Sequence, residues 1–309
     1  MTRRLVRDGV DRAAAAIRAG GLVAMPTETV YGLAADATDP IAVARIFDVK
    51  GRPSDHPLIV HLADPEDLAE WAPDASESAQ RLAAAGWPGP LTLIVPRSDR
   101  LPAAVAGGRN TVGLRVPAHP MAREMIRLAG VPVAAPSANR FGAVSPTTAD
   151  HVIADLGNLL DPDRDVVLDG GPSPIGVEST IVDCTVDPVQ VLRTGAVTVE
   201  QVRGILEADV AGAAGPARAS GMLASHYAPR CEVRLVDAAD DAVALAAGTP
   251  GARILDLTAD VARYARELYA SLRLADTDGI RVVIAVLPAA DGLGHAVRDR
   301  LTKAAAPRS

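Results

Sequence analysis

The sequence predicts an α/β protein of two domains, on the basis of three observations. Short apolar runs of strand length alternate along the chain with segments whose apolar residues recur at helical spacing. The chain has 309 residues, which is long for a single domain. A stretch rich in Gly, Ala and Pro interrupts the pattern near residue 210. The predicted division is therefore a first domain at 1–207, a linker at 208–229 and a second domain at 230–309.

The first domain opens with a predicted surface helix at 9–19 and a buried strand at 22–25. Pro26 ends that strand, because proline cannot donate a hydrogen bond to a neighbouring strand. A helical segment at 39–49 begins with Asp39 as its N-cap and proline at the first helical position. The remaining pattern predicts helices at 65–71, 76–85, 119–129, 147–156 and 198–207, strands at 58–62, 91–95, 111–116, 131–135 and 166–168, and a hairpin of 179–184 with 189–192.

The second domain is predicted to be a small parallel, Rossmann-like α/β unit. Strands are predicted at 231–236, 252–256 and 280–287, and helices at 239–247, 260–275 and 292–304. Strand–helix–strand order favours parallel pairing, because each helix returns the chain to the same end of the sheet. This part has no Gly-rich phosphate loop, and the sequence indicates no functional site in it.

Composition and charge exclude several protein classes. The net charge is −7, and residues 1–207 carry 19 Lys+Arg against 26 Asp+Glu, which is not the basic balance of a typical nucleic-acid-binding domain. No apolar run approaches the roughly 18–20 residues of a membrane span, so we expect no membrane partner. The two cysteines, Cys184 and Cys231, fall in different predicted domains, which indicates the reducing cytoplasm and no disulfide framework.

Motifs for metal binding and for two common kinds of catalysis are also missing. The six histidines show no HxxxH or Cys/His spacing, so we expect no metal held by the protein. There is no G-x-x-x-x-G-K-[ST] sequence, so the chain is not a P-loop enzyme. Ser137 follows a predicted strand but lacks the G-x-S-x-G elbow of a serine nucleophile, so we do not expect covalent catalysis.

Lys50 is the most informative single residue. Of the 31 lysines and arginines only two are lysines, and this one ends a predicted helix and is followed closely by Arg52. One interpretation is a cation that stabilises the helix C-terminus. The interpretation that Arg52 favours is a phosphate site, because an ammonium group approaches phosphate oxygens from any direction. The hydroxyls at 27–29 and the side chains of His56 and His61 complete a candidate anion site at the ends of neighbouring elements.

Three other positions each carry two interpretations. Arg115, at the end of the predicted strand 111–116, is either a solvated arginine or an anion ligand. Ser145 either caps the helix at 147–156 or contacts a ligand. Trp87 either packs under its Gly/Pro-rich turn or forms part of a cavity wall.

Five motifs occur in order along the first domain: PTETVYGL, KGRPSDHPLIVH, GLRVP, APSAN and ESTIVD. Together they resemble the YrdC/YwlC family of L-threonylcarbamoyladenylate synthases over roughly residues 8–207. The sequence HYAP at 226–229 resembles the longer, two-domain members of that family. The resemblance implies a YrdC-like twisted mixed sheet with helices around a concave cavity.

The resemblance also implies a nucleotidyltransferase reaction with L-threonine, bicarbonate and ATP as substrates. The threonine amine forms a carbamate, whose oxygen attacks the α-phosphorus of ATP while pyrophosphate leaves. The product, threonylcarbamoyl-AMP, is handed to a transferase complex that modifies the adenosine beside the anticodon of certain tRNAs. Mg²⁺ is expected to accompany ATP, held mostly by phosphates and water, and no organic cofactor is implied.

The binding residues of the family carry over onto matching positions of this chain. The threonine contacts fall on Thr29, His61, Arg115 and Ser179. The ATP contacts fall on Lys50, Arg52, His56, Thr111, Ala135, Ser137, Ser145, Arg193 and Tyr227, and Lys50 and Arg52 are the implied catalytic residues. His56 stands where many members have asparagine. Segment 208–229 is predicted to be a lid over the cavity mouth that brings Tyr227 near ATP, against the simpler interpretation of a spacer.

Two other functions stay open on the sequence alone. One is a double-stranded-RNA-binding module, since relatives have been viewed as binding such RNA; the acidic balance of residues 1–207 weakens it. The other is a carbamoyl-adenylate-forming enzyme that uses carbamoyl phosphate, like the related domain of hydrogenase-maturation proteins.

Overall fold

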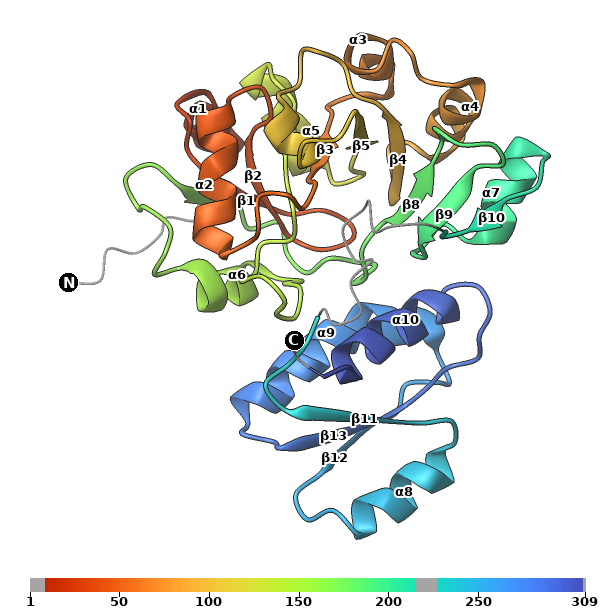
Figure 1. Cartoon of the computed structure of the whole chain (residues 1–309). Helices are drawn as coiled ribbons and strands as arrows, with labels where there is room; N and C mark the ends of the chain where they lie inside the picture. The colour runs from red at the N-terminus through yellow and green to blue at the C-terminus, as the bar shows by residue number, and fades with distance from the viewer. Residues whose placement is uncertain (1–8, 215–226, 308–309) are drawn as a thin grey trace.

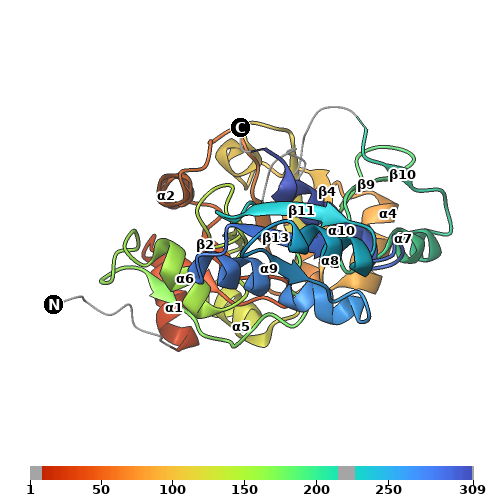
Figure 2. The same ribbon diagram turned by 90° about the horizontal axis from the view of Figure 1, so that it is seen from below.

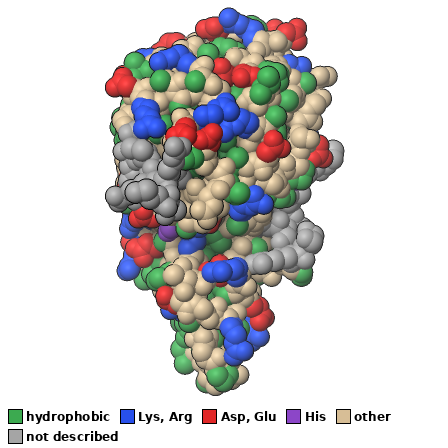
Figure 3. All heavy atoms as spheres, turned by 90° about the vertical axis from the view of Figure 1, so that its left-hand side faces the viewer, with side chains coloured by type: hydrophobic (Ala, Val, Ile, Leu, Met, Phe, Trp, Pro, Cys, Tyr) green, Lys and Arg blue, Asp and Glu red, His purple; other side chains and the backbone are tan. Residues whose placement is uncertain are grey.

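The computed structural model describes residues 9–214 and 227–307. Figure 1 shows a larger domain, coloured red to green, above a smaller domain coloured blue. Figure 3 shows the smaller domain as a narrower lobe below the first, and on this face acidic and basic side chains are interspersed. Residues 215–226 of the predicted linker lie outside the described residues. Within the described ranges, no helix combines the length and apolar character that crossing a bilayer requires.

The first domain is built on one ten-stranded sheet. Its strands are β1 (Val23–Met25), β2 (Gly32–Asp36), β3 (Ile59–His61), β4 (Leu91–Pro96), β5 (Thr111–Arg115), β6 (Val133–Ala134), β7 (Val166–Val167), β8 (Thr180–Asp183), β9 (Gln190–Arg193) and β10 (Ala211–Gly212). They lie in the order β10-β9-β8-β4-β5-β3-β6-β2-β1-β7. Pairs such as β3 with β5 are parallel and pairs such as β4 with β5 are antiparallel, so the predicted mixed sheet is confirmed.

Helices cover both faces of this sheet. They are α1 (Val10–Arg18), α2 (Pro40–Lys50), α3 (Leu68–Trp71), α4 (Glu77–Gly86), α5 (Pro120–Ala129), α6 (Ala149–Leu156) and α7 (Val199–Leu206), with 3-10 turns η1 (Pro65–Asp67) and η2 (Ala103–Ala106). Alternate residues of β1 enter different cores: Ala24 packs with α2, whereas Val23 and Met25 pack with α1 and α5. Burial on both faces explains why this strand is a continuous apolar run rather than an alternating one.

Helix α2 forms as the sequence predicts. Asp39 accepts a hydrogen bond from the backbone N–H of Ile41 at 2.8 Å, and Pro40 occupies the first turn, where no intrahelical donor is needed. Gly51 ends the helix with a φ of +63°, a conformation that glycine adopts without steric cost. This cap fixes where Lys50 leaves the helix and where Arg52 begins the next loop.

The second domain is a three-stranded parallel sheet with helices on both sides. Strands β11 (Glu232–Val236), β12 (Arg253–Leu255) and β13 (Val282–Val286) lie in the order β11-β13-β12. Helix α8 (Ala239–Ala247) packs on one face through Ala242, and α9 (Val261–Thr277) and α10 (Gly294–Ala305) pack on the other. Figures 1 and 2 show that α9 and α10 lie on the side of this sheet that faces the first domain.

Two strands were not predicted from the sequence. Residues 32–36 form β2, which pairs antiparallel with both β1 and β6 near the middle of the sheet. Residues 211–212, at the start of the predicted linker, form β10 and pair with β9. The linker therefore begins as the edge strand of the first domain, and Val210 packs in the same core as Val202 of α7.

The two domains share a continuous apolar contact. Val30, Val144 and Val177 of the first domain lie in one buried cluster with Tyr227 and with residues of α9 such as Tyr269. This contact brings α9 and α10 against the loops at the ends of β1 and β8, where the candidate site lies.

Candidate active site

A cavity opens at the end of the central strands of the first domain. It encloses about 570 Å³ of empty space, counting the part open to solvent. The lining comes from the loops after β1, α2 and β6, from strands β2, β3, β5 and β9, from the two residues just before β8 and from Tyr227. The lining residues are Thr27, Thr29, Val30, Gly32, Arg52, Ile59, His61, Arg115, Ala135, Pro136, Ser137, Glu178, Ser179, Arg193 and Tyr227.

The turn after β1 is held rigid by its own hydroxyl groups. The Thr27 hydroxyl donates to the carbonyl of Val30 at 2.6 Å and lies 2.9 Å from the hydroxyl of Thr29. Arg115 donates to the hydroxyl of Thr29 at 2.9 Å and to the carboxylate of Glu28 at 2.6 Å. The second oxygen of Glu28 accepts from the backbone N–H of Ala118 at 2.9 Å. Pairing with Glu28 balances the buried charge of Arg115 and fixes its direction at the cavity wall.

His61 and Arg115 lie side by side because their strands are parallel and in register. His61 ends β3, Arg115 ends β5, and the two residues are register partners. Burial, and then the charge of Arg115, lower the pKa of His61 to about 3. The ring is therefore neutral at physiological pH, with one nitrogen that donates and one that accepts hydrogen bonds.

A second group of polar residues lies where β8 and β9 meet. Arg193, at the end of β9, donates to the carbonyl of Ser179 at 3.0 Å and to its hydroxyl at 3.1 Å. The same hydroxyl lies 2.7 Å from that of Thr92 on β4. Ser179 therefore connects the central strands of the sheet with a buried guanidinium group.

The loop after α2 forms a third side. Arg52 is largely buried, donates to the carbonyl of Pro57 at 3.0 Å and lies over the ring of Phe141. Burial lowers the pKa of Arg52 to about 10, which still leaves the group charged at neutral pH. Lys50 donates to the carbonyls of Ser137 and Asn139 at 2.6 and 2.5 Å, and so holds the turn that follows β6.

Glu178 is the acidic residue of the cavity wall. It accepts hydrogen bonds from Ser145 at 2.6 Å, from Tyr269 at 2.8 Å and from Arg300 at 2.7 Å. Burial alone raises the pKa of this carboxyl, but the charges of Arg300 and Arg193 and the bonds from Arg300 and Ser145 outweigh it and lower the pKa to about 2. Glu178 is therefore ionised at every working pH.

The structure brings most of the sequence-predicted site residues together. Nine line the cavity: Thr29, Arg52, His61, Arg115, Ala135, Ser137, Ser179, Arg193 and Tyr227. Lys50 and Ser145 stand directly behind lining residues, through their bonds to Ser137 and Glu178. His56 packs edge-on against Phe141, 5.3 Å between ring centroids. Thr111 begins β5 while Arg115 ends it, which separates the two by about 13 Å of strand.

The sequence did not single out three residues of this site. Glu28 and Glu178 lie within the motifs PTETVYGL and ESTIVD without an assigned role, and Arg300 lies in the second domain, where the sequence indicates no site. The sequence does contain a signal for Arg300, which lies on the apolar face of its helix with Val297, Leu301 and Ala304. A charge on such a face needs a buried partner. Trp87, in contrast, packs under its turn and donates to the carbonyl of Leu91 at 2.7 Å.

Comparisons with known proteins agree with this arrangement. The family model Sua5_yciO_yrdC, described as "Telomere recombination", matches residues 15–195. A second model, described as the C-terminal domain of threonylcarbamoyl-AMP synthase, matches residues 197–306.

Three relatives illustrate how far the similarity extends. The threonylcarbamoyl-AMP synthase of Pyrococcus abyssi is 40% identical over 96% of this chain and 94% of its own. That of Bacillus subtilis is 37% identical over 97% of this chain and 93% of its own. A relative from Mycobacterium tuberculosis is 39% identical but aligns with only 66% of this chain, while covering 91% of its own length.

A solved structure matches the fold of both domains. The crystal structure of P. abyssi Sua5 complexed with L-threonine superimposes with a TM-score of 0.89 at 39% identity, and the match covers 96% of this chain and 94% of that one. The predicted two-part α/β fold is thereby confirmed. This chain belongs to the Sua5/YciO/YrdC family, and it carries the C-terminal domain that characterises the two-domain threonylcarbamoyl-AMP synthases.

Proposed function

We propose that this protein is an L-threonylcarbamoyladenylate synthase, which makes threonylcarbamoyl-AMP and pyrophosphate from L-threonine, bicarbonate and ATP. The observation that carries the proposal is the arrangement of two groups across one cavity: His61 beside Arg115, and Arg193 beside Ser179. The first suits a small amino acid and the second suits an anion. Relatives that align with almost the full chain bear the name of this activity.

The threonine subsite lies at the ends of β3 and β5 and extends to Ser179, just before β8. Arg115 offers a guanidinium group to the amino-acid carboxylate, and its bond to Glu28 holds it in place. Thr29, His61 and Ser179 supply hydroxyl groups and a neutral imidazole that hydrogen-bond the threonine hydroxyl. None of these three groups is charged, so none of them forms an ion pair with the amine. A site built of paired polar groups discriminates strongly against a ligand that lacks the matching hydroxyl.

The nucleotide subsite uses the cations on the other walls. Arg52 and Arg193 face the polyphosphate, with Lys50 behind the turn at Ser137. The backbone at Ala135 and Ser137 and the ring of Tyr227 border the rest of the nucleotide. The family resemblance also assigns ATP contacts to His56, Thr111 and Ser145. These three residues contact the nucleotide once it is bound.

The reaction needs positioned charges rather than a covalent intermediate. The ammonium group of bound threonine first loses its proton to solvent. The uncharged amine then attacks the carbon of bicarbonate, water leaves, and a carbamate forms. A carbamate oxygen then attacks the α-phosphorus of ATP, and the bond to the β-phosphate oxygen breaks to release pyrophosphate. Arg52 and Arg193 stabilise the negative charge that develops on the phosphate oxygens. Closure of the cavity keeps water from the carbamate and from the mixed anhydride.

Magnesium enters this proposal as the companion of ATP. Among the described residues there is no group of three His, Cys, Asp or Glu side chains that could hold a metal ion. We assign its ligands to the triphosphate and to water, as is usual for Mg²⁺ with nucleotides. The unstable product is handed to a transferase complex that modifies tRNA, and both steps take place in the cytoplasm, where ATP and tRNA are abundant.

The test is pyrophosphate release from ATP with Mg²⁺, bicarbonate and each of the twenty amino acids in turn. L-Threonine should give release well above all others, bicarbonate should be required, and mass spectrometry should find threonylcarbamoyl-AMP. A second arm replaces threonine and bicarbonate with carbamoyl phosphate. Release in that arm, without release in the first, would replace this proposal with a carbamoyl-adenylate activity.

A further inference from the structure

The second domain contributes directly to the cavity wall through Glu178. Two of the three side chains that donate to this carboxylate come from that domain: Tyr269 from α9 and Arg300 from α10. The third donor, Ser145, belongs to the first domain. The carboxylate is 6% exposed and lines the cavity, so its charge is felt by whatever binds there.

Arg300 joins the two domains at this point. Its side chain is completely buried, and its guanidinium group donates to Glu178 at 2.7 Å and to the carbonyl of Thr194 at 3.0 Å, both in the first domain. It also donates to its neighbour Asp299 at 2.6 Å and lies over the ring of Tyr227, 5.3 Å from the centroid. A fully buried arginine is costly unless it is paired, so this position is specified by its partners rather than by packing.

The charge balance of the cavity depends on this pair. The charged side chains that line it in the described chain are Arg52, Arg115, Arg193 and Glu178. Glu28 pairs with Arg115, and Arg52 and Arg193 are the other two cationic side chains of the described lining that face a bound polyanion. Without Arg300, the carboxylate of Glu178 would repel phosphate and would compete with it for Arg193, its other nearby cation.

We propose that Arg300 is a positioning residue for ATP: from the second domain it neutralises the Glu178 carboxylate and thereby limits the competition of Glu178 with the triphosphate for Arg193. Tyr269 assists by donating to the same carboxylate oxygen. The inference rests on the proposed function, and it gives the second domain an electrostatic role in nucleotide use. It also explains why Glu178 is buried at a site for an anion.

The first test is Arg300→Gln, assayed by pyrophosphate release in the full-length protein. The KM for ATP should rise at least tenfold, which corresponds to about 1.4 kcal/mol. The KM for L-threonine should change less than threefold, because threonine is a zwitterion and carries no net charge into the cavity. A loss of interdomain structure alone would affect both substrates or kcat instead.

The second test restores the charge balance. In Glu178→Gln/Arg300→Gln both charges are removed together, so the KM for ATP should return to within threefold of wild type. This variant also separates charge from stacking, because it does not restore the contact of Arg300 with Tyr227. A double variant as defective as Arg300→Gln would overturn the proposal and would assign the effect to Tyr227 or to domain docking.

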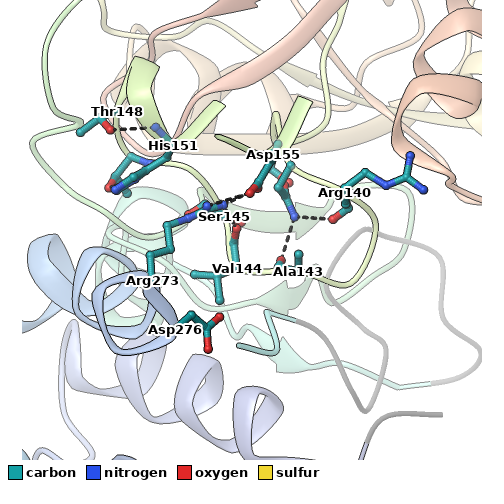
Figure 4. Close-up of polar contacts among 12 residues, drawn as sticks. Arg140, Ala143, Val144, Ser145, Thr148, His151, Asp155, Arg273 and Asp276 are labelled. Atoms are coloured by element: carbon teal, nitrogen blue, oxygen red, sulfur yellow. Dashed lines mark hydrogen bonds and ion pairs between the residues drawn. The ribbon is translucent and has the colours of Figure 1, made fainter. Parts of the chain in front are cut away.

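Arg273 provides a matched control on α9. Like Arg300 it crosses the domain boundary, with an ion pair to Asp155 at 2.6 Å and hydrogen bonds to the carbonyls of Val144 and Ser145 (Figure 4). None of these three partner residues lines the cavity. Arg273→Gln should therefore lower the melting temperature but leave the KM for ATP within about twofold of wild type. If Arg273→Gln and Arg300→Gln raise the KM for ATP equally, the effect comes from weaker docking of the two domains and not from the charge of Glu178.

The outcomes separate this inference from the proposed function. A wild-type protein that releases no pyrophosphate with threonine refutes the function itself. An active wild type with an unchanged KM for ATP in Arg300→Gln refutes only the inference. If Arg300→Gln does not fold, Arg300→Lys and the double variant decide: both should retain ATP affinity within threefold, and a tenfold loss in the double variant overturns the proposal.

Discussion

The Nζ atom of Lys50 lies 2.6 Å from the carbonyl oxygen of Ser137, so the last residue of α2 fastens the turn that follows β6. A second bond, to the carbonyl of Asn139, completes the attachment. Burial, and then the charge of Arg52, lower the pKa of Lys50 well below its ordinary value. Through these two bonds Lys50 shapes the wall of the cavity that Ser137 lines.

Replacement of Lys50 should impair ATP use. Lys50→Ala is expected to lower kcat/KM for ATP by an amount equivalent to ~2–4 kcal/mol, as for loss of a charged donor near a developing anion. The control is Arg45→Ala on the same helix, which removes a partly buried ion pair with Asp165 (3.0 Å) away from the cavity. Arg45→Ala should lower the melting temperature without this kinetic loss. Wild-type kinetics in Lys50→Ala would rule out its proposed role.

The two subsites should respond separately to substitution. Arg115→Ala and His61→Ala should raise the KM for L-threonine more than the KM for ATP, because both residues lie in the group between β3 and β5. Arg52→Ala should show the opposite preference, since it lies on the cationic wall. Steady-state kinetics with each substrate varied in turn measures both values. The reverse ordering would mean that the two subsites have been exchanged.

The stability of the protein should fall in mild acid because of His61. Its pKa is lowered from 6.5 to about 3, so between these values the unfolded chain binds a proton that the folded chain does not. The free energy of unfolding therefore decreases as the pH falls below 6.5, by up to about 1.4 kcal/mol per pH unit. His151, with a pKa lowered to about 4, acts in the same direction.

His61→Gln removes this titration, so its melting temperature should fall less than that of wild type between pH 6.5 and pH 4.5. The two melting temperatures should run parallel above pH 7, where the histidine is neutral in both the folded and unfolded states. Parallel curves over the whole range would show that His61 takes up a proton in the folded protein.

The local elements of the fold were largely predictable, because they depend on short-range signals. The Asp39 cap, Pro40 and Gly51 gave the bounds of α2, and the apolar runs gave the strands that flank it. Strand β2 was missed because Gly-Leu-Ala-Ala-Asp is poor in the β-branched and aromatic residues typical of strands. It forms because β1 and β6 pair with it on both sides. The local sequence of a strand does not reveal such pairing with other segments.

The site was predictable to the extent that its residues lie at the ends of adjacent elements. His61 and Arg115 end two apolar strands, and Ser179 and Arg193 belong to one predicted hairpin. What the sequence could not give is the contact between domains. Glu178 and Arg300 are 122 positions apart, and their pairing depends on how the second domain docks. The division at residue 207 and the lid at 208–229 stay predictions.

The last prediction concerns Tyr227, which reaches the cavity from the end of the linker. It is a buried non-glycine residue with a φ of +61°, a conformation held in place by the packing of its ring against Tyr269 and Arg300. We expect the second domain, besides supplying Arg300, to be needed because it holds this ring at the cavity wall and excludes water. Removing the second domain should therefore cost activity even where the first domain folds.

Two experiments test this role of the second domain and of Tyr227. Truncation after Ala214 keeps α7, Val210 and β10, and so leaves the core of the first domain intact; this length is close to that of the Mycobacterium tuberculosis relative. The truncated protein should fold, as judged by circular dichroism, but should lose most threonylcarbamoyl-AMP formation. In the full chain, Tyr227→Gly suits the positive φ and removes only the ring, so a loss of about tenfold there, with Tyr227→Phe near wild type, assigns the effect to the ring. A truncated protein as active as the full chain at the same substrate concentrations would refute the lid.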